Sequence, residues 1–144
     1  LVLVGDGVLR GELERMVAER GLERHINFFG VVAQEEVAAM LRSADLLLLS
    51  SAYEGMPRCV VEALGSGVPV VSTNVGEVSR LVKSGVNGAL VQSREPHEFS
   101  AAIRSVLESI DRLRGAPCVD SVQDFQAKTV LSDLYQKYRL HAKR

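Results

Sequence analysis

Short apolar runs alternate with stretches in which apolar residues recur every three or four positions. The runs predict strands, and the recurring positions predict amphipathic helices. The predicted strands cover residues 1–4, 26–30, 46–49, 68–72 and 89–91. The run from Leu46 to Leu49 is apolar at every position, which is typical of a parallel strand that is covered on both faces.

Helical spacing fills the gaps between the predicted strands and continues after the last of them. The predicted helices contain Leu9 to Val17, Val37 to Leu41, Pro57 to Gly65, Leu81 and Val82, Pro96 to Ile110, and Val130 to Tyr138. Pro57 and Pro96 are expected at the first helical position, where the missing N–H costs the helix nothing.

The regular alternation of strands and helices predicts an α/β fold with an open, doubly wound, Rossmann-like parallel sheet. The break at Gly115-Ala116-Pro117 divides the chain into a lobe at 1–115 and a helical segment at 116–144 that packs on it. Ligands of such sheets bind at the carboxyl ends of the strands, so the residues that follow each strand are the candidates for function.

Composition narrows the class of protein. The chain has 144 residues, 47% of them hydrophobic, and a net charge of -1, which fits one folded domain and excludes a disordered chain or one that strongly attracts nucleic acid; we expect no nucleic-acid partner. Cys59 and Cys118 lie far apart without a CxxC motif, which argues against a zinc site and favours a reducing, cytoplasmic location. No apolar run is long enough to cross a membrane. The strand at 1–4 starts without a methionine, so we expect an excerpt of a longer protein.

The turn Gly5-Asp6-Gly7 follows the first predicted strand and precedes a helix. A dinucleotide fingerprint would have its third glycine at position 10, where Arg10 stands, so the match fails. Two glycines still let the backbone approach a ligand closely, and the following helix directs free N–H groups toward it. A tight turn without a ligand remains an alternative.

Glu54 and Glu62 are separated by seven residues in the segment from Ser50 to Val71. Glu54 is expected in the loop after a strand, and Glu62 on the helix that Pro57 opens, among apolar neighbours. An ionised carboxylate in apolar company costs several kcal/mol unless something hydrogen-bonds it, and the vicinal hydroxyls of a sugar could do so. Alternatively, Glu62 pairs with a nearby arginine and Glu54 only benefits from the helix dipole.

This segment resembles the E-x7-E signature of the retaining, nucleotide-sugar-dependent glycosyltransferases of family 4, which have the two-lobed GT-B fold. Other family features occur in the same order: Gly5-Asp6-Gly7, Phe28-Phe29-Gly30, Ala44-Asp45, Gly76, and Gly85-Val86-Asn87-Gly88. The resemblance runs from Leu1 to about Ser109. It implies that the chain is the carboxy-terminal, donor-binding lobe of such an enzyme, inactive by itself.

The resemblance implies a role for each matching position. Glu62 would bind the ribose hydroxyls of the donor, and Glu54, the catalytic candidate, would lie beside the transferred sugar and its phosphate. The remaining donor-binding candidates are Gly55, Met56 and Pro57 around the sugar–diphosphate, Phe29 and Gly30 near the base, and Gly5 and Gly7 bordering the nucleotide.

Two departures from the family pattern stand out. Gly76-Glu77 replaces a pair of glycines and adds a side chain near the expected site. The family's phosphate-binding arginine and lysine belong to a strand–helix unit that would precede Leu1, and the amino-terminal lobe with the acceptor site would also precede it. His25, His97 and His141 are expected on the surface and do not replace that lobe's catalytic histidine.

The resemblance implies transfer from a UDP-, GDP- or ADP-sugar with retention of configuration, without a metal ion or another cofactor, in cell-surface polysaccharide assembly. The segment from Ala127 to Arg144 is mildly basic, and contact with anionic lipid at the inner membrane face is weighed against a solvated surface, which is favoured. The alternatives are a sugar-nucleotide 2-epimerase and a non-catalytic nucleotide-binding module. An oxidoreductase comes last because the fingerprint fails at Arg10.

Overall fold

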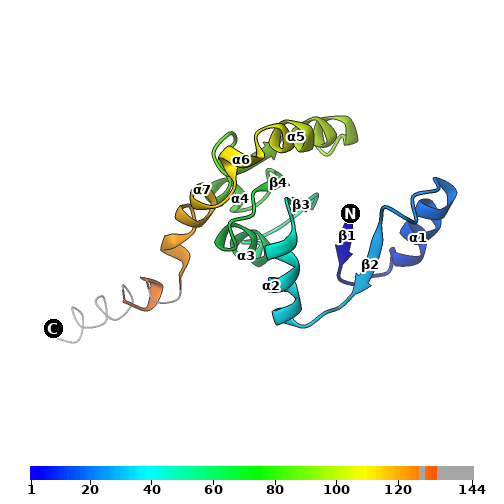
Figure 1. Ribbon diagram of the computed structural model, residues 1–144, viewed down its shortest axis with the longest axis horizontal. Coiled ribbons are helices and arrows are strands. Elements are labelled where there is room, and N and C mark those ends of the chain that lie inside the picture. Colours follow the sequence, from blue (N-terminus) through cyan, green and yellow to red (C-terminus); the bar gives the residue numbers. More distant parts are fainter. Residues whose placement is uncertain (127–128, 133–144) are drawn as a thin grey trace. The chain divides into compact units, whose positions relative to one another are not determined.

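The computed structural model describes residues 1–126 and 129–132 of the chain (Figure 1). These residues form two compact units, which we call unit 1, Leu1–Ala39, and unit 2, from Met40 onward. The division after Ala39 differs from the predicted boundary after residue 115, which stays a prediction. The helix predicted from Val130 to Tyr138 lies mostly outside the described residues.

Unit 1 contains two parallel strands and a helix that connects them. β1 (Val2–Val4) pairs with β2 (Asn27–Gly30), and α1 (Arg10–Glu19) lies between them in the chain. The register shifts by one residue between Leu3 and Val4, so that Val4 is opposite Gly30. α2 (Gln34–Ser43) follows β2 and continues into unit 2.

Unit 2 is built on a parallel sheet of three strands in the order β3-β4-β5. Its strands are β3 (Leu47–Leu49), β4 (Val70–Thr73) and β5 (Gly88–Val91). Its helices are α3 (Arg58–Gly65), α4 (Val78–Leu81), α5 (Pro96–Glu108), α6 (Ile110–Leu113) and α7 (Ala116–Asp120), followed by a 3-10 turn, η1 (Gln123–Phe125). The central strand, β4, is buried at all four positions, including the polar Ser72 and Thr73. The run at 46–49, which was expected to be covered on both faces, instead forms β3 at the edge of this trio, and its three positions are only half-buried.

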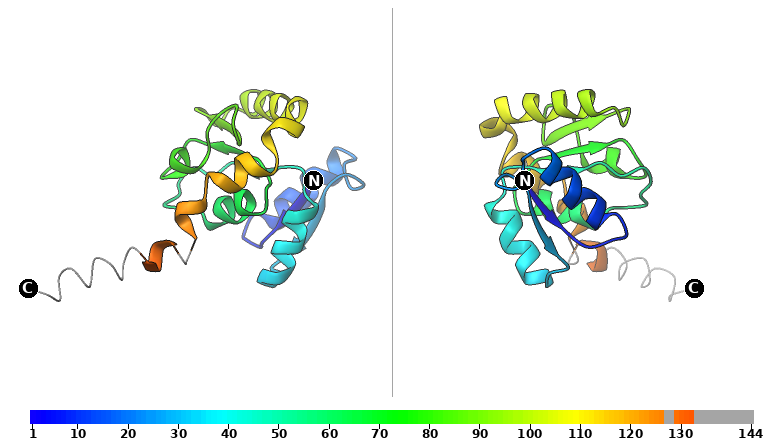
Figure 2. Two further views of the ribbon diagram at one scale, coloured as in Figure 1. Left: turned by 60° about the vertical axis from the view of Figure 1, so that its left-hand side comes forward. Right: turned by 90° about the vertical axis from the view of Figure 1, so that its right-hand side faces the viewer.

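The core of unit 2 lies on both faces of β4. Val71 packs with Val91, Val106 and Leu113 on the face that α5 covers, and Figure 2 shows α5 running beside the sheet. Side chains alternate along a strand, so Val70 is directed to the opposite face, the side of α3. α7 contacts α3, and Cys118 of α7 is completely buried. Burial of such side chains is the main stabilising contribution to the unit.

The α/β class with parallel strands is confirmed, and all five predicted strands are present. In the described residues their hydrogen bonds form a pair and a trio instead of one five-stranded ladder, so β1 and β3 each have a strand partner on one side only. Pro57 is also one position earlier than predicted. It precedes α3 as the N-cap, with extended backbone, whereas Pro96 begins α5 as expected.

Candidate functional site

The loop between β3 and α3 contains Glu54 and leads directly into an open helix end. Pro57 is the N-cap of α3, and no side chain caps the helix there. The first N–H groups of a helix have no partner within the helix and carry the positive end of its dipole. Gly55 and Met56, immediately before this end, are exposed. In the part of the chain that the structure describes, their N–H groups donate to no protein acceptor.

Glu54 is half-buried and is fixed by a neighbour in the same loop. The Ser51 hydroxyl donates a hydrogen bond of 2.7 Å to the Glu54 carboxylate. The Ser51 carbonyl accepts a hydrogen bond of 2.6 Å from the hydroxyl of Thr73, at the end of β4. The loop is thus connected to the central strand, which limits how far the carboxylate can move.

The loop after β4 supports the Glu54 loop by a close backbone contact. The N–H of Glu77 donates to the carbonyl of Gly55 at 2.9 Å. Gly76 has a φ of +52°, and a Cβ at this position would overlap the carbonyl oxygens of Glu54 and Gly55. Glycine is therefore required at position 76. The side chain of Glu77, the departure from the family pattern, is exposed and forms an ion pair of 2.9 Å with Arg80.

Glu62 differs from the expectation of a carboxylate among apolar neighbours. Its side chain is 34% exposed, and its carboxylate lies 3.6 Å from the guanidinium of Arg58, one helical turn earlier. Water and Arg58 solvate the charge, so the expected burial cost does not arise. The alternative expectation, that Glu62 pairs with a nearby arginine, agrees with the structure as far as the ion pair is concerned. Arg58 is 80% exposed, however, and such surface ion pairs contribute little to stability.

Cys59 lies near both carboxylates, a position that was not predicted from the sequence. Burial raises the pKa of the Cys59 thiol, and the negative charges of Glu54 and Glu62 raise it further. The negative charges of Glu54 and Glu62 therefore both affect a side chain in the first turn of α3, although seven residues separate the two glutamates. The positions of the two glutamates, five residues before Cys59 and three residues after it, were the available sequence signal.

The other sequence candidates, Gly5, Gly7, Phe29 and Gly30, all lie in unit 1. The Gly5 N–H donates to the Gly30 carbonyl at 2.7 Å, and so joins the turn after β1 to the end of β2. Gly5 and Gly30 have φ values of +118° and +70°, which L side chains rarely adopt. Gly30 is buried, whereas the Phe29 ring is about half exposed. Unit 1 thus brings these four candidates together, and unit 2 does so for Glu54 to Glu62.

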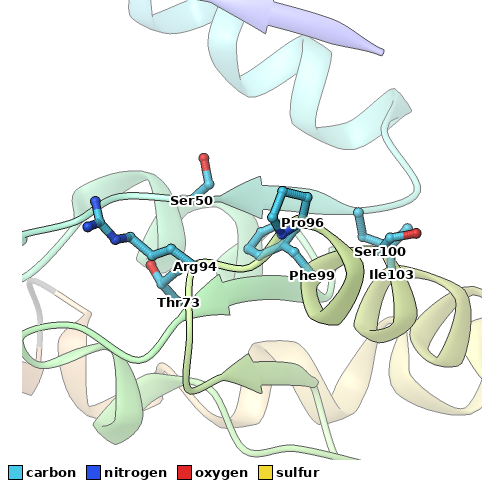
Figure 3. A pocket seen from close by; sticks show the side chains of 7 residues that line it. All are labelled: Ser50, Thr73, Arg94, Pro96, Phe99, Ser100 and Ile103. Atoms are coloured by element: carbon cyan, nitrogen blue, oxygen red, sulfur yellow. The ribbon is translucent and has the colours of Figure 1, made fainter.

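A cavity of about 320 Å³ opens in unit 2 beside the start of α5 (Figure 3). Figure 3 shows Arg94 and Thr73 at one end and Ser100 and Ile103 at the other. The remaining lining residues are Ser50, Pro96 and Phe99. The lining is mainly apolar and includes none of the sequence candidates.

His25 and His97 are exposed, as expected, and His141 lies outside the described residues. Within residues 1–126 and 129–132, no group of three His, Cys, Asp or Glu side chains is arranged to bind a metal ion. No helix in this part of the chain is both long and apolar enough to span a bilayer.

Solved structures with the same fold define the class of protein. Sucrose-phosphate synthase from Thermosynechococcus elongatus is 26% identical with a TM-score of 0.86, over 100% of this chain and 39% of that one. HepE from Anabaena, in complex with UDP and glucose, is 27% identical with a TM-score of 0.83, over 96% of this chain and 40% of HepE. The fold is that of one lobe of a GT-B glycosyltransferase.

Residues 1–114 match the family described as glycosyl transferases group 1, and the chain belongs to that family. An uncharacterized glycosyltransferase of Methanocaldococcus jannaschii is 27% identical, over 96% of the chain and 33% of the relative. A D-inositol 3-phosphate glycosyltransferase of Streptomyces griseus is 31% identical, over 91% of this chain and 29% of the relative. The chain thus spans about a third of the length of these curated relatives.

Proposed function

We propose that residues 1–115 are the carboxy-terminal, donor-binding lobe of a retaining glycosyltransferase of family 4. The observation that carries the proposal is the placement of Glu54 and Glu62 on either side of the uncapped N-terminus of α3. The HepE structures contain UDP and UDP-glucose, which supports a nucleotide-sugar as the ligand to test first.

The donor diphosphate is proposed to bind at the N-terminus of α3. The N–H groups of Gly55 and Met56 are exposed and available, and the helix dipole favours negative charge there. Pro57 fits this position because its missing N–H removes no donor from the helix. The same groups would stabilise the diphosphate as it leaves, which is where negative charge develops during transfer.

Glu62 is proposed to accept hydrogen bonds from the two ribose hydroxyls of the donor. A carboxylate has two oxygens and acts as an acceptor only, which matches a pair of adjacent hydroxyl donors. Arg58 competes little, because an exposed ion pair is worth about 0–1 kcal/mol. The exchange of Arg58 for ribose therefore costs little free energy.

Glu54 is proposed to lie beside the transferred sugar and its phosphate. Its hydrogen bond with Ser51 holds one oxygen and leaves the other available for a sugar hydroxyl. In the proposed reaction the acceptor oxygen bonds to the anomeric carbon on the face from which the diphosphate leaves. The acceptor proton passes to the departing diphosphate, so no protein nucleophile is needed.

In unit 1, Gly5 and Gly7 are proposed to border the nucleotide, and Phe29 and Gly30 to lie near its base. Glycines let a ligand approach the backbone closely, and the half-exposed Phe29 ring offers a stacking surface. For the longer protein we propose an acceptor site in an amino-terminal lobe, a cytoplasmic location and a role in cell-surface polysaccharide assembly, with no metal ion. Contact of the basic terminal segment with the inner membrane face is the weaker part of this proposal.

Calorimetric titration of the chain with UDP, GDP and ADP tests the proposal. We expect one nucleotide to bind, and Glu62→Ala to weaken that binding by about 1–3 kcal/mol, the cost of losing a hydrogen-bonded polar contact. Glu98→Ala is the control, because Glu98 is an exposed glutamate on another helix of unit 2, α5, outside the proposed donor site. Equal effects of the two substitutions would refute the role of Glu62.

An activity assay with a longer protein that contains this chain tests the reaction. The proposal predicts transfer of the sugar to an acceptor with the anomeric configuration retained. An isomerised UDP-sugar without acceptor product would indicate the epimerase. Nucleotide binding without either product would indicate a non-catalytic module.

A further inference from the structure

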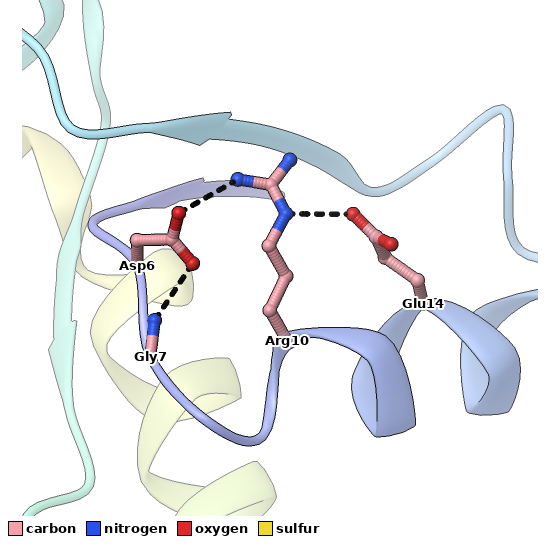
Figure 4. A network of polar contacts seen from close by, with 4 residues as sticks. All are labelled: Asp6, Gly7, Arg10 and Glu14. Atoms are coloured by element: carbon pink, nitrogen blue, oxygen red, sulfur yellow. Dashed lines mark hydrogen bonds and ion pairs between the residues drawn. The ribbon is translucent and has the colours of Figure 1, made fainter.

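Arg10 occupies the position at which a dinucleotide fingerprint would have its third glycine, and the structure gives this side chain several partners. It is the first residue of α1, and its side chain is 34% exposed. Side chains on a helix lean toward its N-terminus, which directs Arg10 back over the turn from Gly5 to Gly7. Figure 4 shows its guanidinium between the carboxylates of Asp6 and Glu14.

Two carboxylates orient the guanidinium. The Arg10 Nε donates to the Glu14 carboxylate at 2.8 Å, and Nη1 lies 3.7 Å from Asp6 Oδ2. The hydrogen bond to Glu14 is also the largest cause of a raised pKa of Arg10, so its positive charge is secure. One short hydrogen bond and one longer ion pair therefore orient the guanidinium from two sides.

The Asp6 carboxylate transmits this constraint to the backbone. Its other oxygen, Oδ1, accepts a hydrogen bond of 2.8 Å from the N–H of Gly7 (Figure 4). One carboxylate therefore joins the Arg10 side chain to the backbone of the glycine turn. Loss of Arg10 would free Asp6 to turn toward water and release Gly7.

Arg10 also reaches the strand end on the other side. Its guanidinium carbon lies 6.0 Å from the centroid of the Phe28 ring, within the range of a cation–π contact. A Cβ at Gly30 would lie 3.1 Å from Arg10 Nη1, so the glycine leaves room for the guanidinium. Because Gly5 donates to the Gly30 carbonyl, the turn and the strand end meet directly beside Arg10.

We propose that Arg10 is a positioning residue that holds the Gly5–Gly7 turn and the Gly30 strand end in one geometry, and that this geometry sets nucleotide affinity. The effect on nucleotide affinity rests on the proposed function, whereas the effect of Arg10 on the backbone geometry does not. Arg10 itself touches no nucleotide in this account.

Amide hydrogen exchange, measured by NMR without nucleotide, tests the hold. In Arg10→Met we expect exchange at Gly5 and Gly7 to accelerate about tenfold, as the loss of a charge-assisted hydrogen bond implies. Arg15→Met is the matched control: Arg15 lies on α1, pairs with Glu19 at 3.8 Å and is 70% exposed. It should leave both amides unchanged, although it also removes an i,i+4 ion pair from the helix.

A double-mutant cycle with Asp6→Asn distinguishes the effect of Arg10 through Asp6 on Gly7 from any effect of Arg10 on the stability of α1. If Arg10 acts through Asp6, the double variant should show no faster exchange at Gly7 than either single variant. Additive effects, or unchanged exchange at Gly5 and Gly7 in a folded Arg10→Met chain, would overturn the proposal. Asp6→Asn alone provides the same readout if Arg10→Met does not fold.

Titration with the bound nucleotide completes the test. We expect Arg10→Met to raise the Kd about threefold to tenfold, and Arg15→Met to leave it unchanged. Faster exchange with an unchanged Kd would make Arg10 merely structural and overturn its positioning role. If the wild-type chain binds none of UDP, GDP and ADP, the donor-lobe proposal fails, while the exchange data still decide whether Arg10 holds the turn.

Discussion

The loops that contain the candidate residues are stabilised differently in the two units. In unit 2, the Glu54 loop rests on a strand that is buried at every position, and backbone contacts from the Gly76 loop fix it. In unit 1, a backbone hydrogen bond joins the glycine turn to Gly30, and we propose that the charged side chains around Arg10 also hold the turn. The buried hydrophobic side chains of the described residues all belong to unit 2, whereas Val8, Leu9 and Val31 of unit 1 are largely exposed.

This difference indicates how each region should respond to perturbation. Apolar burial is not screened by salt, and removing a buried side chain costs several kcal/mol. Ion pairs at a surface are screened by salt and individually weak. Unit 2 should therefore be sensitive to changes in its core, and unit 1 to changes of charge or ionic strength.

The largest expected effect comes from the core of unit 2. Leu64 of α3 is completely buried, and Leu64→Ala should lower the free energy of unfolding by about 2–5 kcal/mol. Leu13→Ala is the matched change in unit 1, where the side chain is about two fifths exposed. Its effect should be below about 1 kcal/mol. Urea unfolding followed by circular dichroism measures both, and similar losses would remove the contrast between the units.

The next effect concerns the backbone contact beneath Glu54. Gly76→Ala should destabilise unit 2 by about 1–3 kcal/mol and weaken nucleotide binding, because the methyl group would overlap the Glu54 and Gly55 carbonyls. Gly85→Ala is the control, since Gly85 also has a positive φ but has open space around it. Its cost should be limited to about 1–2 kcal/mol of backbone strain, without an effect on the nucleotide. Thermal unfolding and calorimetry distinguish the two outcomes.

A smaller effect is expected from pH. Burial raises the pKa of the Cys118 thiol from its ordinary value of 9.0 to about 11. The folded state therefore retains the thiol proton longer than the unfolded state, and its stabilising contribution is complete below about pH 9. That contribution should be lost as the pH rises through about 11. Cys118→Ala should flatten this fall in urea midpoints, and an equally steep fall in the variant would contradict the assignment.

The smallest effect separates the units by salt. Raising the salt concentration from about 0.1 M to about 1 M shortens the Debye length from about 10 Å to about 3 Å. Amide exchange at Gly7 of unit 1 should then accelerate about twofold to threefold, whereas exchange at Val71 should not. Equal changes at both amides would show that the charged network does not maintain the turn.

The sequence was sufficient for features that depend on local chemistry. The apolar runs predicted every strand, and Pro96 and the glycine turns marked where elements begin and end. Features that depend on tertiary contacts could not be predicted from the sequence. The exposure of Glu62 follows from where α3 packs, and the requirement for glycine at position 76 follows from the approach of a loop about twenty residues away in the chain. The sequence pattern around Arg10 showed a failed fingerprint, but not the partners of its guanidinium.

We propose above that the N-terminus of α3 binds the donor diphosphate, and an NMR titration of the chain with UDP can show this residue by residue. We expect the largest amide shifts at Gly55 and Met56, and we expect Glu62→Ala to reduce the affinity without moving the site. Shifts confined to the cavity around Arg94 and Phe99 would contradict it.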